Sequence, residues 1–391
     1  MRSPMTSTAS KLAALAAALI VLTAPAMAQN TSSAISGRIT GSEGKPLAGA
    51  VVPVVHNESG SVNKLVTDAE GRYGARGLRV GGPYTITISK DGKVEKREDV
   101  FLPLAETLNL DASLGAEALQ KVVVTGAANI KIFNNAAMGT GTSIGHAELE
   151  SFASIQRNLQ DYARMDPRLS QTDKERGEIS AAGQNSRFNS ITIDGVTTSD
   201  TFGLEANNLP TAKQPISIDA IDSVQVNVAN YDVTQKGYTG ANINAVTKSG
   251  TNEFKGSAYY VFRNDSGVGD RYNRANDSYF PFLPFKETTT GATLGGPIVQ
   301  DKLFFFVNYE ELKSGRAQPE FGPVGSSLTN VAISQGAIDA LKTLAKNQYK
   351  FDIGDSIGPS QLLVKDALAK VDWNISDQHR ASLRLARTEQ N

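Results

Sequence analysis

PISIDAIDSVQV (residues 215–226) and GANINAVTKSG (residues 240–250) are the two runs of sequence that decide the fold. In both runs apolar residues recur at alternate positions, which predicts short β-strands. A connection rich in Gly, Tyr and Asn separates them, and from Glu253 to Arg263 the alternation continues as one long strand. Sequence before this stretch predicts small soluble modules, and sequence after it predicts long amphipathic strands. The stretch is therefore the boundary between two kinds of structure.

Composition excludes several classes of function. The chain has 391 residues and a formal net charge of -1, with no basic run, so no nucleic-acid partner is expected. It has no cysteine, which excludes a disulfide framework and a thiolate metal site. The three histidines, His56, His146 and His379, fall in different modules without the spacing of metal ligands. We expect neither a metal nor a cofactor.

The N-terminus has the pattern of a secretory signal peptide. An apolar run from Leu12 to Thr23 is followed by Ala26-Met27-Ala28, which predicts a signal peptide over residues 1–28 with cleavage between Ala28 and Gln29. A membrane anchor is the alternative, but the apolar run is too short for a comfortable span. No other stretch approaches 18 apolar residues. Any crossing of a membrane would therefore use a β-barrel.

Residues 29–115 show short strands separated by Gly-rich turns, which predicts a seven-strand-type β-sandwich. The order of these strands resembles the carboxypeptidase regulatory-like domain, of the carbohydrate-binding-like fold. A sugar site would need exposed aromatic rings, and the candidates are Tyr73, Tyr84 and Phe101. All three occupy positions where a sandwich needs bulk, so we expect them in the core.

A linker and an α+β module follow. Residues 116–126 form a polar linker that contains four strand-forming residues, Val122, Val123, Val124 and Thr125. Residues 127–250 combine a helical pattern from Leu149 to Arg164 with two short strands. This module has many aspartates, listed here: Asp161, Asp166, Asp173, Asp194, Asp200, Asp219 and Asp222. No histidine pocket or nucleophile motif accompanies them, so we expect solvated turns and hydrogen bonds between domains, and no catalytic residue.

Residues 251–391 carry about five long strands. In the first of them the apolar residues Phe254, Gly256, Ala258, Tyr260 and Phe262 share one face. The other strands are expected near residues 287–295, 302–311, 364–375 and 380–387, and the loops between the strands alternate long, short, long, short. This parity is typical of a transmembrane β-barrel with long loops at one end and tight turns at the other.

The run from Ile218 to Tyr259, with YDV at 231–233 and NAVTKSGTNEFKGSAY at 244–259, resembles the end of the plug and the start of the barrel in TonB-dependent outer-membrane receptors. The order of residues in this run most resembles that of the Oar-like subgroup. Siderophore receptors usually have Arg-Gly-Pro after the position of Val226, whereas residues 227–229 are Asn-Val-Ala here. Ligand assignments from siderophore receptors are therefore not carried over.

The resemblance implies an outer-membrane receptor, not an enzyme, that takes up an unidentified substrate through a plugged barrel. Residues 127–250 would be the plug, and Val122–Thr125 the TonB box by which a TonB-type energy-transducing protein of the inner membrane pulls. The sandwich and the plug would face the periplasm and the barrel would contact outer-membrane lipid. The extracellular substrate is unknown, and a carbohydrate or a peptide are the candidates.

Three expectations stay open. Plugged transporters have about 22 strands, so five strands indicate the N-terminal part of a longer receptor. The first alternative function is an Oar-like outer-membrane protein that serves adhesion, envelope organisation or protein export. The second is a carbohydrate-binding module at the cell envelope.

Overall fold

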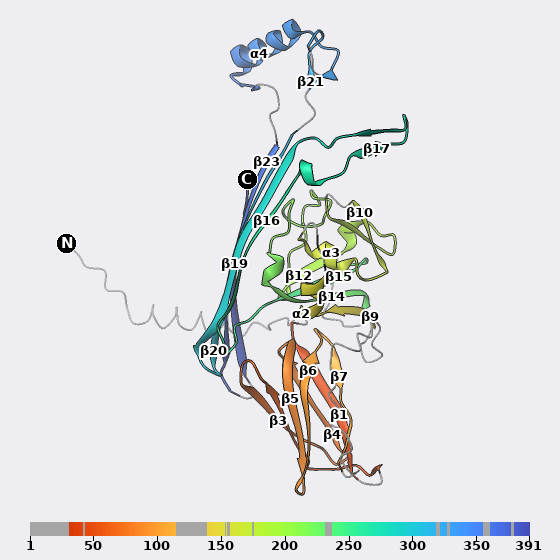
Figure 1. Cartoon of the computed structure of the whole chain (residues 1–391), viewed down its shortest axis with the longest axis vertical. Coiled ribbons are helices and arrows are strands. Elements are labelled where there is room, and N and C mark those ends of the chain that lie inside the picture. Colours follow the sequence, from red (N-terminus) through yellow and green to blue (C-terminus); the bar gives the residue numbers. More distant parts are fainter. Residues whose placement is uncertain are drawn as a thin grey trace, which may run out of the picture.

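The computed structural model describes residues 31–391 except 42–43, 115–138, 153, 155–156, 174–175, 231–236, 318–320, 327–328, 355–359 and 377–378. The predicted signal peptide with Ala28 and Gln29, and the linker with Val122–Thr125, lie outside the described residues. Three bodies follow one another along the chain (Figure 1). We call them the sandwich, the inner domain (residues 139–247) and the wall, a sheet of long strands that the inner domain packs against.

The sandwich consists of two four-stranded sheets. The first contains β1 (Ser33–Gly41), β4 (Arg72–Leu78), β7 (Thr107–Asn109) and β8 (Ala112–Leu114). The second contains β2 (Val51–His56), β3 (Ser61–Val66), β5 (Gly81–Lys90) and β6 (Lys93–Leu102). Apolar side chains from both sheets form one core, including Ile35, Val52 and Ile86. The sandwich fold is as expected, with eight strands because the last segment divides into β7 and β8.

The three aromatic residues of the sandwich do not share one environment. Tyr73 and Tyr84 are buried, and their hydroxyls donate to the carbonyl oxygens of Leu110 and Arg79 at 2.7 Å and 2.9 Å. Phe101 is 51% exposed, so its predicted place in the core is wrong. On β6 the alternation turns its neighbours Val100 and Leu102 inward, which leaves Phe101 facing solvent.

The inner domain is built on a five-stranded sheet in the order β13-β12-β15-β14-β9. Its strands are β9 (Gly139–Ile144), β12 (Ser190–Ile193), β13 (Val196–Thr197), β14 (Ile221–Asn230) and β15 (Asn242–Thr247). A ribbon of β10 (Leu169–Asp173) and β11 (Glu178–Ala181) lies beside it. Residues 215–226 and 240–250 contribute to β14 and β15, which pair antiparallel at the centre of the sheet.

The helix predicted over residues 149–164 is instead two short helices, α2 (His146–Ser151) and α3 (Leu159–Ala163). Arg157 has a φ of +50°, which no right-handed helix accommodates. Asn158 then caps α3, because its side chain accepts a hydrogen bond from the Asp161 N–H at 2.8 Å. Leu149, Leu159 and Tyr162 still point into the core. The helical spacing thus predicted correctly which residues are buried, but the single continuous helix that it predicted is wrong.

The wall is a five-stranded antiparallel sheet in chain order. Its strands are β16 (Lys255–Asn264), β19 (Phe285–Val299), β20 (Leu303–Arg316), β23 (Ser360–Asn374) and β24 (Arg380–Gln390). The five predicted strands are confirmed, and two of them reach 15 residues. Over the described residues the sheet does not close into a barrel. The end of the wall away from the sandwich carries the hairpin β17 (Arg271–Asn273) and β18 (Ser278–Phe280), then α4 (Gln335–Tyr349) (Figure 1).

The two faces of the wall differ in environment. One face is apolar and exposed, with Phe262, Trp373 and Leu385 at 67%, 50% and 67% exposure. The other face packs against the inner domain, and Phe306 and Leu368 join its core. This alternation fits strands with lipid on one side and a domain on the other. No helix among the described residues is long and apolar enough to cross a membrane.

Candidate functional site

One row of residues crosses all five strands of the wall and faces the inner domain. Each member is paired in register with the next, in this order: Tyr259, Gly291, Glu310, Asp366 and Thr388. Residues directly opposite each other in antiparallel strands point to the same face. We call this set the polar row. It places two carboxyl groups side by side on the wall, where the inner domain meets them.

Gly291 leaves room within the polar row for the side chain of Tyr259. An ideal Cβ atom on Gly291 would lie 2.3 Å from the Tyr259 hydroxyl oxygen. The tyrosine can therefore reach across β19 and donate a hydrogen bond to Glu310 Oε2 on β20. Any side chain at position 291 would close this path, so the glycine is required by close approach and not by an unusual backbone angle.

Ser217 is the residue of the inner domain that binds the centre of the row. Its N–H donates to Asp366 Oδ2 at 3.0 Å, and its hydroxyl donates to Glu310 Oε2 at 2.9 Å. Its hydroxyl oxygen also lies 2.9 Å from that of Tyr259. Ser217 precedes the short 3₁₀ helix η3 (Ile218–Ala220), and its side chain caps that helix by accepting from the Asp219 N–H at 3.2 Å. This cap helps to fix the side chain of Ser217 in this position.

Thr388 completes the row at its other end. Its hydroxyl lies 2.8 Å from Asp366 Oδ1 and 3.0 Å from the carbonyl oxygen of Pro215. Asp366 Oδ2 thus accepts from the inner domain, and Asp366 Oδ1 shares the single Thr388 hydroxyl proton with the carbonyl oxygen of Pro215. Since Pro215 belongs to the same loop as Ser217, one loop of the inner domain bridges β20, β23 and β24.

Arg157 supplies the positive charge at the polar row. Its guanidinium pairs with Asp219, lies 3.6 Å from Glu310 Oε2, and sits 4.6 Å from the centroid of the Tyr259 ring. Burial opposes the charge on Arg157, but Asp219 and Glu310 outweigh burial and raise its pKa above the ordinary value. The strained φ of Arg157 therefore brings one cation to two carboxylates and an aromatic face.

Further polar contacts join the inner domain to the wall on both sides of the row. Toward the far end, Glu287 on β19 pairs with Arg263 of the wall at 2.9 Å and with Lys213 of the inner domain at 3.8 Å. Toward the sandwich, the Lys370 ammonium donates to the carbonyl oxygen of Thr247 at 3.0 Å, and Arg384 lies 3.4 Å from Asp194. Hydrogen bonds and ion pairs thus hold the two bodies together beside the apolar packing of Phe306 and Leu368.

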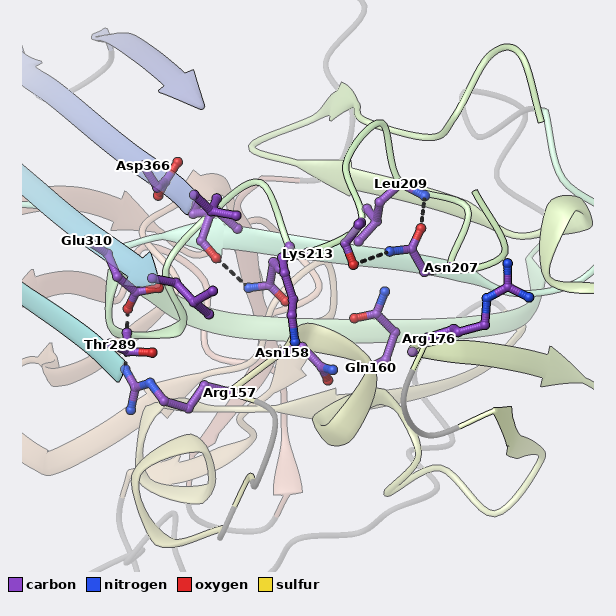
Figure 2. Close-up of a pocket in the computed structure, with 16 residues that line it drawn as sticks. Arg157, Asn158, Gln160, Arg176, Asn207, Leu209, Lys213, Thr289, Glu310 and Asp366 are labelled. Atoms are coloured by element: carbon purple, nitrogen blue, oxygen red, sulfur yellow. Dashed lines mark hydrogen bonds and ion pairs between the residues drawn. The ribbon is translucent and has the colours of Figure 1, made fainter. Parts of the chain in front are cut away.

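A small cavity lies where the polar row meets the inner domain (Figure 2). Arg157, Gln160, Lys213, Glu310 and Asp366 are among the residues that line it. Its volume is about 40 Å³, room for a few water molecules, since one needs roughly 10–15 Å³. Pockets for small-molecule ligands have roughly 300–1,000 Å³. The site is therefore an interface between two bodies of the chain and not a substrate pocket.

The chemistry of the described residues matches an interface. No group of three or more His, Cys, Asp or Glu residues in the described part of the chain could hold a metal ion. The aspartates expected in solvated turns divide into two sets. Asp200 is such a turn residue, and accepts from the N–H groups of Phe202 and Glu205. For Asp166 the expectation is wrong, because it is fully buried against Arg168 and Thr142.

Sequence reasoning did not single out the residues of the polar row. The predicted coupling residues Val122–Thr125 and the cleavage site at Ala28 and Gln29 lie outside the described residues, so the structure places none of them. The alternating pattern placed Tyr259 on the face opposite Phe254 and Phe262, but it was not used to place Asp366. It could not show that they lie in one row, because that depends on the register between strands far apart in sequence.

Two family models match this chain. Residues 34–115 match the carboxypeptidase regulatory-like domain, and residues 246–352 match the outer membrane beta barrel domain. The curated TonB-dependent transporter Oar of Myxococcus xanthus is 28% identical over 373 residues, which are 90% of this chain and 33% of that protein. The chain is a homologue of this TonB-dependent transporter. It spans about a third of the length of that relative.

Two solved structures align with part of this chain. The outer membrane transporter YddB from Escherichia coli has a TM-score of 0.45 at 16% identity, over 63% of this chain and 32% of that one. The siderophore receptor PirA from Acinetobacter baumannii has a TM-score of 0.41 at 17% identity, over 64% of this chain and 31% of that one. The matched barrel domain and the similarity to the transporter indicate an outer-membrane protein.

Proposed function

We propose that this chain belongs to a TonB-dependent receptor that takes up an unidentified substrate through a barrel plugged by the inner domain. The observation that carries the proposal is the docking of Ser217 on the polar row. Hydrogen bonds to carboxylates such as these each contribute only about 1.5–3 kcal/mol net, because water replaces them when they break. A domain held by such contacts is fixed at rest and can leave the wall without unfolding it.

The energy for this movement would come from a TonB-type protein of the inner membrane. Val122–Thr125 is a short strand-forming tetrad that precedes β9 in the chain, as a segment that adds a strand to a partner should be. The first described strand after it, β9, lies at the edge of the inner-domain sheet and, within the part of the chain that the structure describes, pairs with β14 alone. A pull on the tetrad would thus act first on a strand with one partner. The sandwich and the inner domain would face the periplasm, and lipid would cover the exposed apolar face of the wall.

Val123→Pro in the full-length receptor tests this function. Proline cannot donate a backbone hydrogen bond, so it should break strand pairing with the energy-transducing partner. We expect energised uptake to be lost, with surface level and substrate binding kept. Ala118→Pro, in the polar linker before the tetrad, is the matched control and should retain uptake. Loss of binding and uptake together, with less receptor in the membrane, would instead show that Val122–Thr125 is a structural strand.

The substrate class can be approached by two simple measurements. Growth on one nutrient at limiting concentration separates an importer from a protein for adhesion or export, because only loss of an importer gives a nutrient-specific defect. Sugar titration of the sandwich tests carbohydrate binding. Tyr73 and Tyr84 are buried and leave Phe101 as the only exposed ring of the three, which is a poor platform for a sugar. A peptide and a carbohydrate both remain candidates for the barrel itself.

A further inference from the structure

We propose that the sandwich is fixed to the end of the wall nearest to it, which we call the rim, and that it serves as a rigid spacer. This spacer holds the start of the segment that contains Val122–Thr125 at a set distance from the rim. The docking itself is independent of the proposed function. Only the use of the spacer, to present a segment that is pulled, rests on that function. Two contacts, one close approach and the strand order of the sandwich carry the inference.

The first contact is made by the turn between β2 and β3. The carbonyl oxygen of Glu58 accepts a hydrogen bond from the Asn252 N–H at 2.7 Å, and the Glu58 carboxylate pairs with Lys255 at the start of β16. An ideal Cβ atom on Gly60 would lie 1.9 Å from an oxygen of Asp301, in the turn between β19 and β20. The sandwich turn therefore packs directly against two neighbouring ends of the wall.

The second contact is made by Arg79, which follows β4. Its guanidinium donates to the carbonyl oxygen of Gly250 at 3.1 Å and lies 5.0 Å from the centroid of the Phe304 ring. Gly250 is itself packed against the wall, since a Cβ atom there would lie 2.3 Å from the carbonyl oxygen of Phe305. Gly250 is also where the chain passes from the inner domain to β16. Arg79 thus pins the joint between these two bodies.

The sandwich also comes close to the inner domain. A Cβ atom at Gly81, on the first residue of β5, would lie 3.5 Å from a carboxylate oxygen of Asp222 on β14. The sandwich therefore contacts the wall and the joint and lies close to the inner domain. A domain on a loose tether would not meet two separate surfaces with backbone and side-chain contacts. These contacts fix the sandwich rigidly at the rim of the wall.

The order of strands then fixes where the chain leaves the sandwich. Ser33 at the start of β1 pairs with Leu78, next to Arg79 at the rim, whereas Gly41 at the end of β1 pairs with Leu114, the last residue of β8. The strand β1 has nine residues, so these two ends are about 26 Å apart at roughly 3.3 Å per residue. Figure 1 shows the sandwich extending away from the wall along its strands. The chain therefore continues from the end of the sandwich that is remote from the rim.

A fixed spacer changes how a pull would act. The segment after Leu114 begins about 26 Å beyond the rim, closer to a partner anchored on the opposite side of the periplasm. The joint at Gly250 stays attached to the wall and the sandwich. Movement is then favoured at the opposite end of the inner domain in sequence, at β9. A pull would release the inner domain from its first strand while its last residues remain in place.

Cross-linking tests the docking without any substrate. Residues 1–391 contain no cysteine, so in a full-length receptor with any later cysteine replaced by serine, Glu58→Cys with Lys255→Cys can be joined by a short bis-maleimide in isolated outer membranes. The control pair is Glu58→Cys with Lys365→Cys, which lies toward the far end of β23. We expect about tenfold more cross-linking for the first pair, because contact gives it a high effective concentration. Equal yields for the two pairs would overturn the proposal.

Two further variants establish what holds the sandwich and whether it stays docked. Arg79→Ala should reduce the yield of the first pair at least severalfold, and Arg76→Ala, an exposed arginine on β4, should not. An unchanged yield with Arg79→Ala would contradict the role of that residue. The cross-linked receptor should take up substrate at the rate of the unlinked one. Uptake lost only after cross-linking would refute a fixed spacer, whereas uptake absent from the unlinked receptor would count against the proposed function alone.

Discussion

The hydroxyl of Tyr259 occupies the space that a side chain on Gly291 would need, with 2.3 Å between that oxygen and an ideal Cβ position. The two residues are directly paired on β16 and β19. This pairing allows a side chain from one strand to bind a carboxylate two strands away. The contact between the wall and the inner domain thus depends on the absence of a side chain at Gly291 as well as on the polar groups of Tyr259 and Glu310.

Gly291→Ala should loosen the inner domain. The new methyl group would displace Tyr259 from Glu310, and a buried hydrogen bond to a charged group contributes about 1.5–3 kcal/mol. We expect faster hydrogen exchange in residues 215–220 of the full-length receptor, with wall strands unchanged. Gly315→Ala is the control, because a Cβ atom there has nothing nearer than 4.0 Å. The same exchange rates in both variants would show that Tyr259 does not hold the loop.

Arg157→Gln should destabilise the inner domain, because Asp219 and Glu310 would lose their shared cation. Removing one partner of a buried ion pair costs about 3–5 kcal/mol, and partial exposure of these side chains places the expected cost at the lower end. Adding Asp219→Asn should recover part of the loss, since it removes one unpaired charge. Urea unfolding of the inner domain, followed by hydrogen exchange, measures both effects. Arg274→Gln in an exposed loop should change nothing, and no recovery in the double variant would contradict the pairing.

The sandwich should lose stability in acid through His56. Burial first, and then the positive charges of Arg79, Arg380 and Lys255, lower the pKa of His56 to about 3. An unfolded histidine has a pKa of about 6.5, so between these values the unfolded chain binds a proton that the folded chain does not. The free energy of unfolding therefore has its full value above pH 6.5 and falls by up to about 1.4 kcal/mol per pH unit below it.

The variant His56→Asn isolates this effect. His56 Nδ1 accepts from the Ser59 N–H at 3.2 Å, and the asparagine oxygen can take that place without binding a proton. We expect the urea midpoint of the sandwich, measured at pH 7.5 and pH 5, to depend less on pH in the variant. His379→Asn, on an exposed loop, is the control and should behave as the parent. An unchanged pH dependence in His56→Asn would show that another group titrates.

The sequence predicted the fold classes more fully than the contacts between domains. The alternation from Glu253 to Arg263, and the parity of the loops after it, predicted the wall, because a strand with two different environments must alternate. Phe101 was misplaced because periodicity alone does not say which face of an edge strand is covered. The break between α2 and α3 was missed because helical spacing records burial, and it does not show that Phe152 and Asn158 are extended or that Arg157 has a positive φ.

The polar row could not be predicted for a different reason. Its members come from five strands, and Gly291 and Thr388 are nearly 100 residues apart in the sequence. Each strand shows which residues face inward, but the pairing of Glu310 with Asp366 depends on a long loop whose length does not fix the register. Ser217 lies within residues 215–226, yet nothing in the neighbouring residues indicates that it contacts the wall.

In the function proposed above, exchangeable polar contacts hold the inner domain on the wall, and the domain leaves the wall during uptake. The most direct test joins the two bodies through Ala212→Cys and Gln390→Cys, positions outside the polar row whose backbone N–H and side chain meet at 2.9 Å, with a short thiol cross-linker that a reductant cleaves. Substrate binding and energised uptake are then measured on the same cells before cross-linking, after it and after reduction. We expect substrate binding to persist throughout, and uptake to stop on cross-linking and to return on reduction. Undiminished uptake by the fully cross-linked receptor would contradict this proposal.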